Sequence, residues 1–212
     1  ADMVSMARPF LADPDFVAKA AADRADRINT CIGCNQACLD HTFQLQLTSC
    51  LVNPRACHET ELVIAPAVSP RRIAVVGSGP GGLACAVTAA QRGHDVTLFE
   101  SDDQIGGQFT LAAQIPGKEE FRETLRYFRN ALADAGVNVK LGTRVRAGDL
   151  AGYDSVVLAT GVTPRIPTIN GIDHPKVVTY LQVLRDHVPV GDTVAILGAG
   201  GIGFDVAEYL TQ

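Results

Sequence analysis

Short apolar runs alternate with longer amphipathic stretches in the second part of the chain. Runs such as 73–76 (Ile-Ala-Val-Val) have the length and composition of buried β-strands, whereas Phe121, Leu125, Phe128 and Leu132 recur at helical spacing. The predicted strands cover residues 73–76, 96–99, 137–141, 155–159 and 194–197, and the predicted helices cover residues 81–92, 118–135 and 202–212. Alternation of strands and helices predicts an α/β fold with a parallel sheet.

The first third of the chain has a different pattern. Asp13 is a favourable N-cap and Pro14 suits a first helical position, so an Ala-rich surface helix is predicted over 13–27. Residues 29–58 show little periodicity and contain five of the six cysteines, so their order is expected to come from something other than an apolar core. Two prolines make 59–72 a predicted linker.

Composition narrows the range of functions. The chain has 212 residues, 47% of them hydrophobic, and a net charge of −5, so neither nucleic acid nor an anionic membrane is an expected partner. No apolar run approaches the roughly 20 residues needed to span a bilayer, and no signal peptide is recognisable, so a cytoplasmic location is expected. The chain starts without Met and ends within a helical pattern, so we expect a piece of a longer protein.

A glycine-rich motif follows the first predicted strand. Gly77, Gly79 and Gly82 satisfy G-x-G-x-x-G directly before a predicted helix. Glycines at these places allow a tight turn, a close approach of the backbone to a diphosphate, and close packing of helix on strand. Glu100 ends the second strand, where a carboxylate can bind ribose hydroxyls. The alternative is a glycine turn that binds nothing, but strand, helix and acid together favour a dinucleotide site.

The fingerprint occurs a second time after the predicted strand 194–197, at Gly198, Gly200 and Gly203. Its acidic partner would fall beyond the last residue of the chain, so this second motif is the weaker signal. Two fingerprints in one chain suggest two nucleotides, one of them a flavin.

Four cysteines form a spaced cluster. Cys31, Cys34, Cys38 and Cys50 follow the pattern C-x2-C-x3-C-x11-C, which suits an iron–sulfur cluster. A four-thiolate zinc site and disulfides are the alternatives. Proximity to a flavin domain favours iron–sulfur, because zinc carries no electrons. The remaining Cys57 and Cys85 are expected to be packing residues.

Other polar residues give no comparable signal. The five histidines are scattered, and we expect Arg122, Arg126 and Arg129 to form a solvated face of one helix. No catalytic residue is predicted within this chain.

Several segments together resemble the bacterial NADPH-dependent 2,4-dienoyl-CoA reductase family. They are Thr30 to Cys38, Ser49 to Pro54, Ile105 to Phe109, Gln114 to Phe121, and Gly198 to Asp205. This family belongs to a group of multi-cofactor flavoproteins that includes trimethylamine dehydrogenase and enoate reductases. The resemblance extends over essentially the whole chain.

The resemblance implies a domain order. Residues 1–28 would be the end of an FMN-binding eight-stranded α/β (TIM) barrel, and 29–70 a 4Fe–4S segment with its linker. Residues 71–165 would form the first part of a Rossmann-like FAD domain. Residues 166–212 would begin an inserted Rossmann-like NAD(P)H domain.

The resemblance also implies roles for particular residues. Ala7 and Arg8 match positions that contact FMN phosphate, and Gln36 matches a flavin-contacting position. The four spaced cysteines match the cluster ligands. Positions that match FAD contacts are Gly81, Glu100, Gln108, Lys118 and Val145.

The implied activity is a chain of electron transfers from NADPH to FAD, to the cluster, to FMN and finally to a 2,4-dienoyl-CoA thioester. This chain would supply the FAD and 4Fe–4S relay, and the barrel residues that complete the reaction are absent from it. Two alternatives stay open: a related enoate reductase or amine dehydrogenase with the same relay, and an inert truncated fragment.

Overall fold

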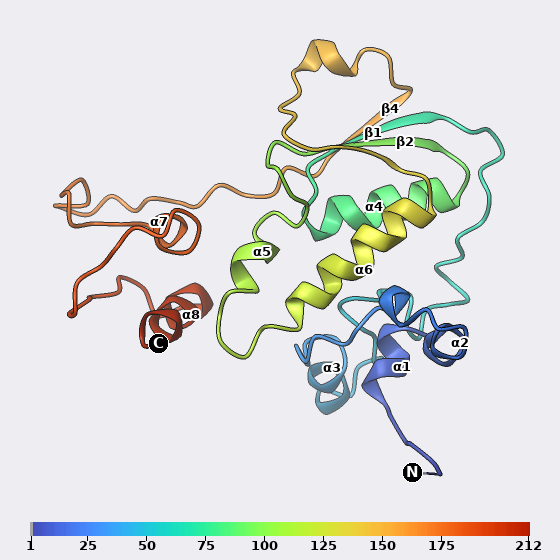
Figure 1. Ribbon diagram of the computed structural model, residues 1–212, viewed down its shortest axis with the longest axis horizontal. Coiled ribbons are helices and arrows are strands. Elements are labelled where there is room, and N and C mark those ends of the chain that lie inside the picture. Colours follow the sequence, from blue (N-terminus) through green and yellow to red (C-terminus); the bar gives the residue numbers. More distant parts are fainter. Residues whose placement is uncertain (1) are drawn as a thin grey trace.

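A computed structural model describes residues 2–212; Ala1, the first residue of the predicted barrel segment, lies outside them. The chain folds into a small sheet with helices below it, an N-terminal segment beneath those helices, and a C-terminal arm to one side (Figure 1). Within the described residues, no helix is both long and apolar enough to cross a membrane.

The sheet has four parallel strands in the order β3-β2-β1-β4. They are β1 (Arg72–Val76), β2 (Asp95–Phe99), β3 (Asn138–Lys140) and β4 (Ser155–Leu158). Val76 is in register with Phe99 on one side and with Leu158 on the other, so the carboxyl ends of three strands meet at one edge. The predicted α/β fold with a parallel sheet is confirmed.

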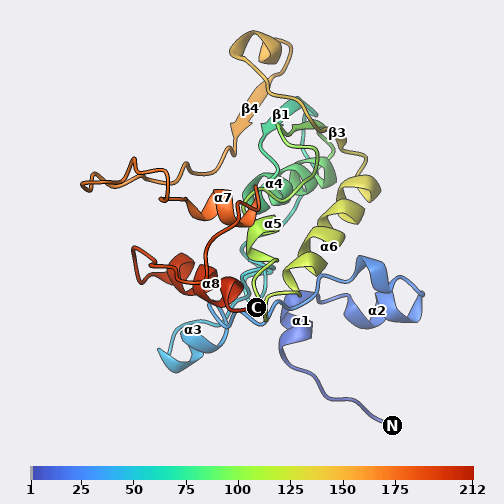
Figure 2. The same cartoon turned by 60° about the vertical axis from the view of Figure 1, so that its left-hand side comes forward.

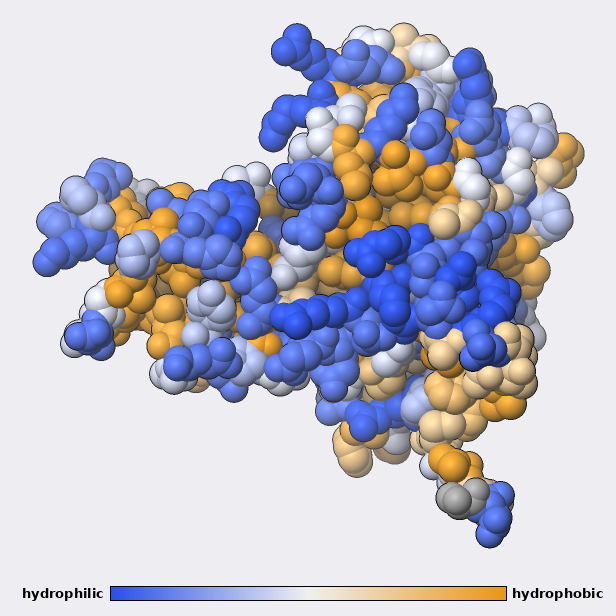
Figure 3. Space-filling model, viewed as in Figure 1, coloured by the Kyte–Doolittle hydropathy of each residue, from blue (hydrophilic) through white to orange (hydrophobic). Residues whose placement is uncertain are grey.

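Two helices cover one face of this sheet: α4 (Pro80–Gln91) and α6 (Phe121–Asp134). The core between them and the strands is closed by fully buried side chains that include Val75, Leu83 and Leu98. The helix α6 is strongly amphipathic: Leu132 enters the core, and hydrophilic side chains cover the helix's outer side (Figure 3). A short turn of helix, η2 (Ala147–Leu150), precedes β4.

The C-terminal part forms a second, smaller core. It joins α5 (Phe109–Ala112), α7 (Tyr180–Leu184) and α8 (Gly201–Leu210) through the buried side chains Leu111, Ile115, Leu184 and Val206. Figure 2 shows α7 and α8 beside each other, away from the sheet.

The predicted strand at 194–197 is wrong. These residues form no strand, and Leu197 is 71% exposed. A strand needs a neighbour for its backbone hydrogen bonds, and none of the four strands pairs with this segment. An apolar run alone is therefore not enough to form a strand.

The N-terminal segment contains α1 (Arg8–Ala12), α2 (Phe16–Ala21), η1 (Ala25–Arg27) and α3 (Leu39–Phe43). The predicted helix over 13–27 is too long, because α2 ends at Ala21 and Asp23 has a left-handed backbone (φ 55°). Asp13 is not the N-cap of this helix; its carboxylate binds groups far along the chain, as described below.

Candidate dinucleotide site and cysteine pocket

The first glycine motif forms the turn that joins β1 to α4. Gly77 has φ 102°, and a Cβ there would lie 2.3 Å from the carbonyl oxygen of Ala159. A Cβ at Gly82 would lie 1.9 Å from the carbonyl oxygen of Gly77. Gly79 is the N-cap of α4, whose free N–H groups point towards the carboxyl edge of the sheet, where an anion binds favourably. Glycine is thus required for backbone packing at two positions of the motif.

Glu100, at the end of β2, is 7% exposed and holds this turn. Its Oε2 accepts hydrogen bonds from the backbone N–H (2.8 Å) and the hydroxyl (2.6 Å) of Ser78, and Oε1 accepts bonds from Ser101 and the N–H of Asp102. Burial by itself raises the pKa of Glu100, but these four bonds outweigh it and leave the pKa below its ordinary value of 4.5. Sequence reasoning missed Ser78, which is fully buried within the glycine motif.

A large cavity of about 1610 Å³ opens at the carboxyl edge of the sheet. Residues predicted to bind FAD or to form the glycine turn line it: Gly77, Gly79, Glu100, Gln108 and Val145. Thr143, Arg144 and the 159–161 turn after β4 also line it. Such an edge is where α/β folds bind dinucleotides. Gly81, Gly82 and Lys118 are not among the lining residues.

Two of the predicted FAD-contacting side chains, Gln108 and Lys118, connect the sheet region to the C-terminal part of the chain. The Gln108 amide donates to the carbonyl of Val162 (3.0 Å) and accepts a bond from the Tyr180 hydroxyl (3.1 Å). The Nζ of Lys118 lies 2.6 Å from both carboxylate oxygens of Asp205 in α8. Their predicted contacts with FAD remain predictions.

The second glycine motif repeats the geometry of the first. Gly198 has φ 117°, Gly200 is the N-cap of α8, and a Cβ at Gly203 would lie 2.2 Å from the carbonyl oxygen of Gly198. The turn therefore forms even without a paired strand before it.

The four spaced cysteines line one pocket, which we call the cysteine pocket: Cys31, Cys34, Cys38 and Cys50. Left-handed residues, Gly33 (φ 67°) and Asn35 (φ 61°), curve the loop that carries the first three. Burial raises the pKa of the Cys50 thiol; backbone hydrogen bonds oppose this rise and the nearby Cys31 and Cys34 add to it. Cysteines 57 and 85 lie outside the pocket, and all six described cysteines are free of disulfides.

Across residues 2–212, no three histidine, cysteine, aspartate or glutamate side chains gather at a position for a single metal ion.

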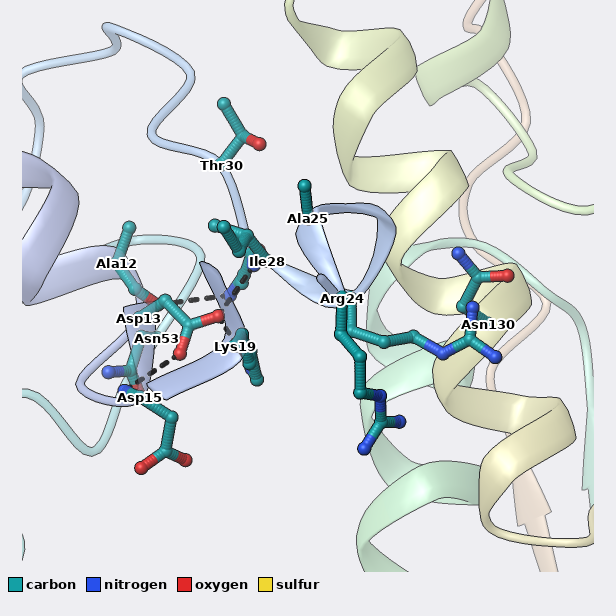
Figure 4. Close-up of polar contacts among 12 residues, drawn as sticks. Ala12, Asp13, Asp15, Lys19, Arg24, Ala25, Ile28, Thr30, Asn53 and Asn130 are labelled. Atoms are coloured by element: carbon teal, nitrogen blue, oxygen red, sulfur yellow. Dashed lines mark hydrogen bonds and ion pairs between the residues drawn. The ribbon is translucent and has the colours of Figure 1, made fainter. Parts of the chain in front are cut away.

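A buried carboxylate fixes the chain just before this pocket. Asp13, 2% exposed, accepts bonds from Lys19 Nζ (2.6 Å), from the N–H of Asn29 (2.7 Å) and from the N–H of Asp15 (3.0 Å) (Figure 4). The Asn29 amide donates in turn to the carbonyls of Ala12 (3.2 Å) and Val52 (2.9 Å). Since Asn29 precedes Cys31 and Val52 follows Cys50, these bonds connect the two cysteine-bearing stretches.

The predicted FMN-contacting residues lie near the cysteine pocket. Arg8 lines it and donates to Oδ1 of Asn35 (2.6 Å), while Ala7 and Gln36 are exposed. The flavin contacts of Ala7, Arg8 and Gln36 remain predictions.

The prediction that three arginines of α6 form a solvated face is wrong for one of them. Arg122 and Arg129 are exposed, but Arg126 is turned towards the N-terminal segment, where it donates to the carbonyl of Ile28 (3.0 Å) and to the hydroxyl of Thr30 (3.2 Å). No pattern within α6 distinguishes it, because its partners lie about a hundred residues earlier.

Residues 71–212 match the family described as pyridine nucleotide-disulphide oxidoreductase. The chain belongs to this family. The match begins at β1 and includes both glycine turns, so it agrees with the parallel sheet and with the cavity at its carboxyl edge. Membership implies binding of FAD and of a nicotinamide nucleotide, and an oxidoreductase function.

Relatives extend the similarity to the cysteine segment. The chain is 39% identical over 221 residues to a "Metal reductase" of Desulforamulus reducens, covering 100% of this chain and 33% of the relative. It superposes on a solved 2-naphthoyl-CoA reductase in complex with 2-naphthoyl-CoA with a TM-score of 0.95 at 38% identity, covering 99% of this chain and 32% of that one.

A solved 6-hydroxypseudooxynicotine amine oxidase from Pseudomonas geniculata gives a TM-score of 0.78 at 31% identity, covering 89% of this chain and 30% of that one. The chain therefore spans about a third of the length of each of these proteins. It is related to a group of flavin oxidoreductases that includes both acyl-CoA reductases and amine-oxidising enzymes.

Proposed function

We propose that this chain is the FAD and 4Fe–4S relay of an NADPH-dependent reductase of conjugated acyl-CoA thioesters, with 2,4-dienoyl-CoA as the substrate class. The single observation that carries the proposal is the presence, in one fold, of a dinucleotide cavity and a pocket lined by four cysteines. Electrons would pass from NADPH to FAD, to the cluster, to FMN in an adjoining barrel, and then to the thioester.

The residues present fit FAD. The glycine turn leaves no room for side chains at Gly77 and Gly82, and the free N–H groups of α4 suit a diphosphate. Glu100 stays ionised at neutral pH, and its two oxygens accept four hydrogen bonds from Ser78, Ser101 and Asp102. It supports the FAD site by holding the glycine turn, and its contact with the ribose remains a prediction. The second glycine turn at Gly198, Gly200 and Gly203 is the proposed place for the nicotinamide nucleotide.

The cysteine pocket fits an iron–sulfur cluster. Thiolates are the usual ligands of such clusters, and four of them surround one space. Four thiolates can also hold a single zinc ion, with Zn–S distances of about 2.3 Å, so the metal and sulfide analysis below separates the two groups.

Each proposed group supplies one part of the chemistry. A flavin accepts the two electrons of a hydride together, and a cluster passes electrons on singly, so the two in series connect a nicotinamide to a distant flavin. The chain's own contribution is to hold both groups at fixed places and to keep the Glu100 carboxylate ionised.

Similarity to the naphthoyl-CoA reductase supports a thioester as the final acceptor, since the aromatic acyl group named there is also conjugated with a thioester carbonyl. The alternative is an amine as the electron donor, which the amine oxidase supports with a lower TM-score. Feeding reduced nicotinamide nucleotide and either substrate to the complete protein separates the two.

The test measures the metal and flavin content of the protein after anaerobic reconstitution. We expect FAD, together with about four iron and four sulfide per chain and little zinc. Replacing Cys34 by Ser should remove most of the iron while FAD remains bound, because the two sites are separate. The matched control is Cys57→Ser, a cysteine exposed outside the pocket, which should retain the full iron content.

Stoichiometric zinc without sulfide would contradict the relay. Absence of both flavin and iron absorption bands would favour an inert fragment. Full iron content in Cys34→Ser would show that the cluster lies elsewhere.

A further inference from the structure

The helix α6 lies between the sheet and the N-terminal segment that leads to the cysteines (Figures 1 and 2). Arg122 and Leu125, in the first half of α6, line the cavity. On the same helix, Arg126 and Asn130 are bonded to residues 25–30. One helix thus lines the dinucleotide cavity and contacts the segment that leads to the cysteine pocket.

Arg126 makes the largest set of these contacts. Its Nη2 donates to the carbonyl of Ile28 (3.0 Å) and to Oγ1 of Thr30 (3.2 Å), and its Nη1 donates to the carbonyl of Asp26. Its Nε donates to the Glu123 carboxylate one turn earlier in α6 (2.6 Å), which orients the guanidinium. A planar guanidinium with several donors can hold two or more acceptors at once in one geometry, which a lysine cannot do.

The groups that accept hydrogen bonds from Arg126 lie just before the cysteine loop. Ile28 is 8% exposed, so its carbonyl group lies in a region from which water is largely excluded. Thr30 directly precedes Cys31, the first residue of the cysteine pocket. Arg126 therefore holds the backbone at the point where the cysteine loop begins.

Neighbouring contacts hold the earlier part of this segment. The Asn130 amide donates to the carbonyl of Asp26 (2.7 Å), and Asp134 accepts from Arg27 (2.8 Å) and Arg24 (3.1 Å). Arg126 extends this set of contacts as far as Thr30.

We propose that Arg126 is a positioning residue that fixes the Cys31 end of the cysteine loop against α6, so that α6 sets the separation and orientation between the flavin and the cluster. This inference rests on the proposed function, because it requires a cluster at the four cysteines. It adds a residue of the flavin domain to the determinants of electron transfer into the cluster, although Arg126 touches neither group's proposed ligands.

The experiment compares Arg126→Gln and Arg126→Lys with the unchanged holoprotein. Rapid mixing with NADPH under anaerobic conditions resolves reduction of FAD from the subsequent one-electron transfer from reduced FAD to the cluster. We expect unchanged FAD content and an unchanged first phase, because Arg126 does not line the cavity. The second phase should slow about 10-fold, the loss typical of removing an outer-shell contact around a metal site.

The electron paramagnetic resonance spectrum of the reduced cluster and its midpoint potential provide readouts that do not depend on activity. Both the spectrum and the potential should change in Arg126→Gln. Arg126→Lys should show nearly the same changes, since lysine supplies the charge without the planar set of donors. The matched control is Arg129→Gln, an exposed arginine on the same helix without a side-chain hydrogen bond or ion pair among residues 2–212, which should leave all five readouts unchanged.

Thr30→Val keeps the inference testable if Arg126→Gln does not fold. It removes only the hydroxyl that Arg126 bonds, and it should shift the cluster spectrum in the same direction. A cluster whose spectrum, potential and rate of reduction are unchanged in both variants overturns the positioning role. If the protein without any substitution contained no iron, that result would overturn the proposed function instead, so the two failures are distinguishable.

Discussion

Glu100 and Ser78 are joined by two hydrogen bonds to one oxygen: the hydroxyl of Ser78 lies 2.6 Å and its backbone nitrogen 2.8 Å from Oε2 of Glu100. The two residues come from neighbouring strands, Ser78 after β1 and Glu100 after β2, and both are nearly inaccessible to water. The glycine turn is therefore shaped by the protein's own carboxylate at the place where a dinucleotide is proposed to bind.

This relationship predicts an acid-dependent loss of stability. The pKa of Glu100 is lowered on folding, so its contribution is complete above the unfolded-state value near 4.5 and is lost as the pH falls through the lower folded-state pKa. Glu100→Gln should lower the free energy of unfolding by about 2 kcal/mol at pH 7, since hydrogen bonds to a buried charged group are lost. Urea unfolding at pH 7 and at successively lower pH measures both effects.

The control for that measurement is Glu208→Gln, an exposed carboxylate in α8, which should change stability little at any pH. A difference between Glu100→Gln and the unchanged protein that stays constant down to pH 3 would mean that the carboxylate is not held as the structure shows.

The glycine turn predicts a contrast between two adjacent positions. Gly82→Ala places a Cβ 1.9 Å from the Gly77 carbonyl oxygen, so helix and strand must separate, and we expect a loss of about 2 kcal/mol and weakened FAD binding. Gly81→Ala is the matched control, because a Cβ there meets nothing within 4 Å and alanine favours a helix. Thermal unfolding of the flavin-free protein compares the two; equal stability of both variants would contradict the packing argument.

The buried carboxylate before the cysteine pocket predicts a local effect. Asp13→Asn leaves the Lys19 ammonium without its 2.6 Å partner and replaces one acceptor by a donor beside the N–H of Asn29. Asp13 is buried but Lys19 is 24% exposed, so losing hydrogen bonds to this charged group should cost about 2 kcal/mol. We also expect faster amide hydrogen exchange around Asn29 and Cys31. Asp15→Asn, an exposed neighbour, is the control. Unchanged exchange in Asp13→Asn would show that this carboxylate does not order the loop.

Much of the fold follows from local pattern. The four strands of the sheet, the helices α4 and α6 and the two glycine turns lie where periodicity and glycine spacing predict them. The run at 194–197 does not form the expected strand, since a strand also requires a partner for its backbone groups, and composition carries no information about that partner. Asp13 fails as an N-cap for a related reason: its carboxylate binds Asn29, sixteen residues later.

The sequence by itself determined the two glycine turns and predicted that the four spaced cysteines lie together, because both features depend on spacing within short stretches of the chain. Only the tertiary structure decided which distant groups meet. Arg126 was predicted to belong to a solvated arginine face, but packing brings it into hydrogen-bond contact with Thr30. Packing also pairs Lys118 with Asp205. Such contacts depend on how separate elements pack, and packing is a property of the whole chain, whereas hydrophobic and glycine patterns are read within a few residues.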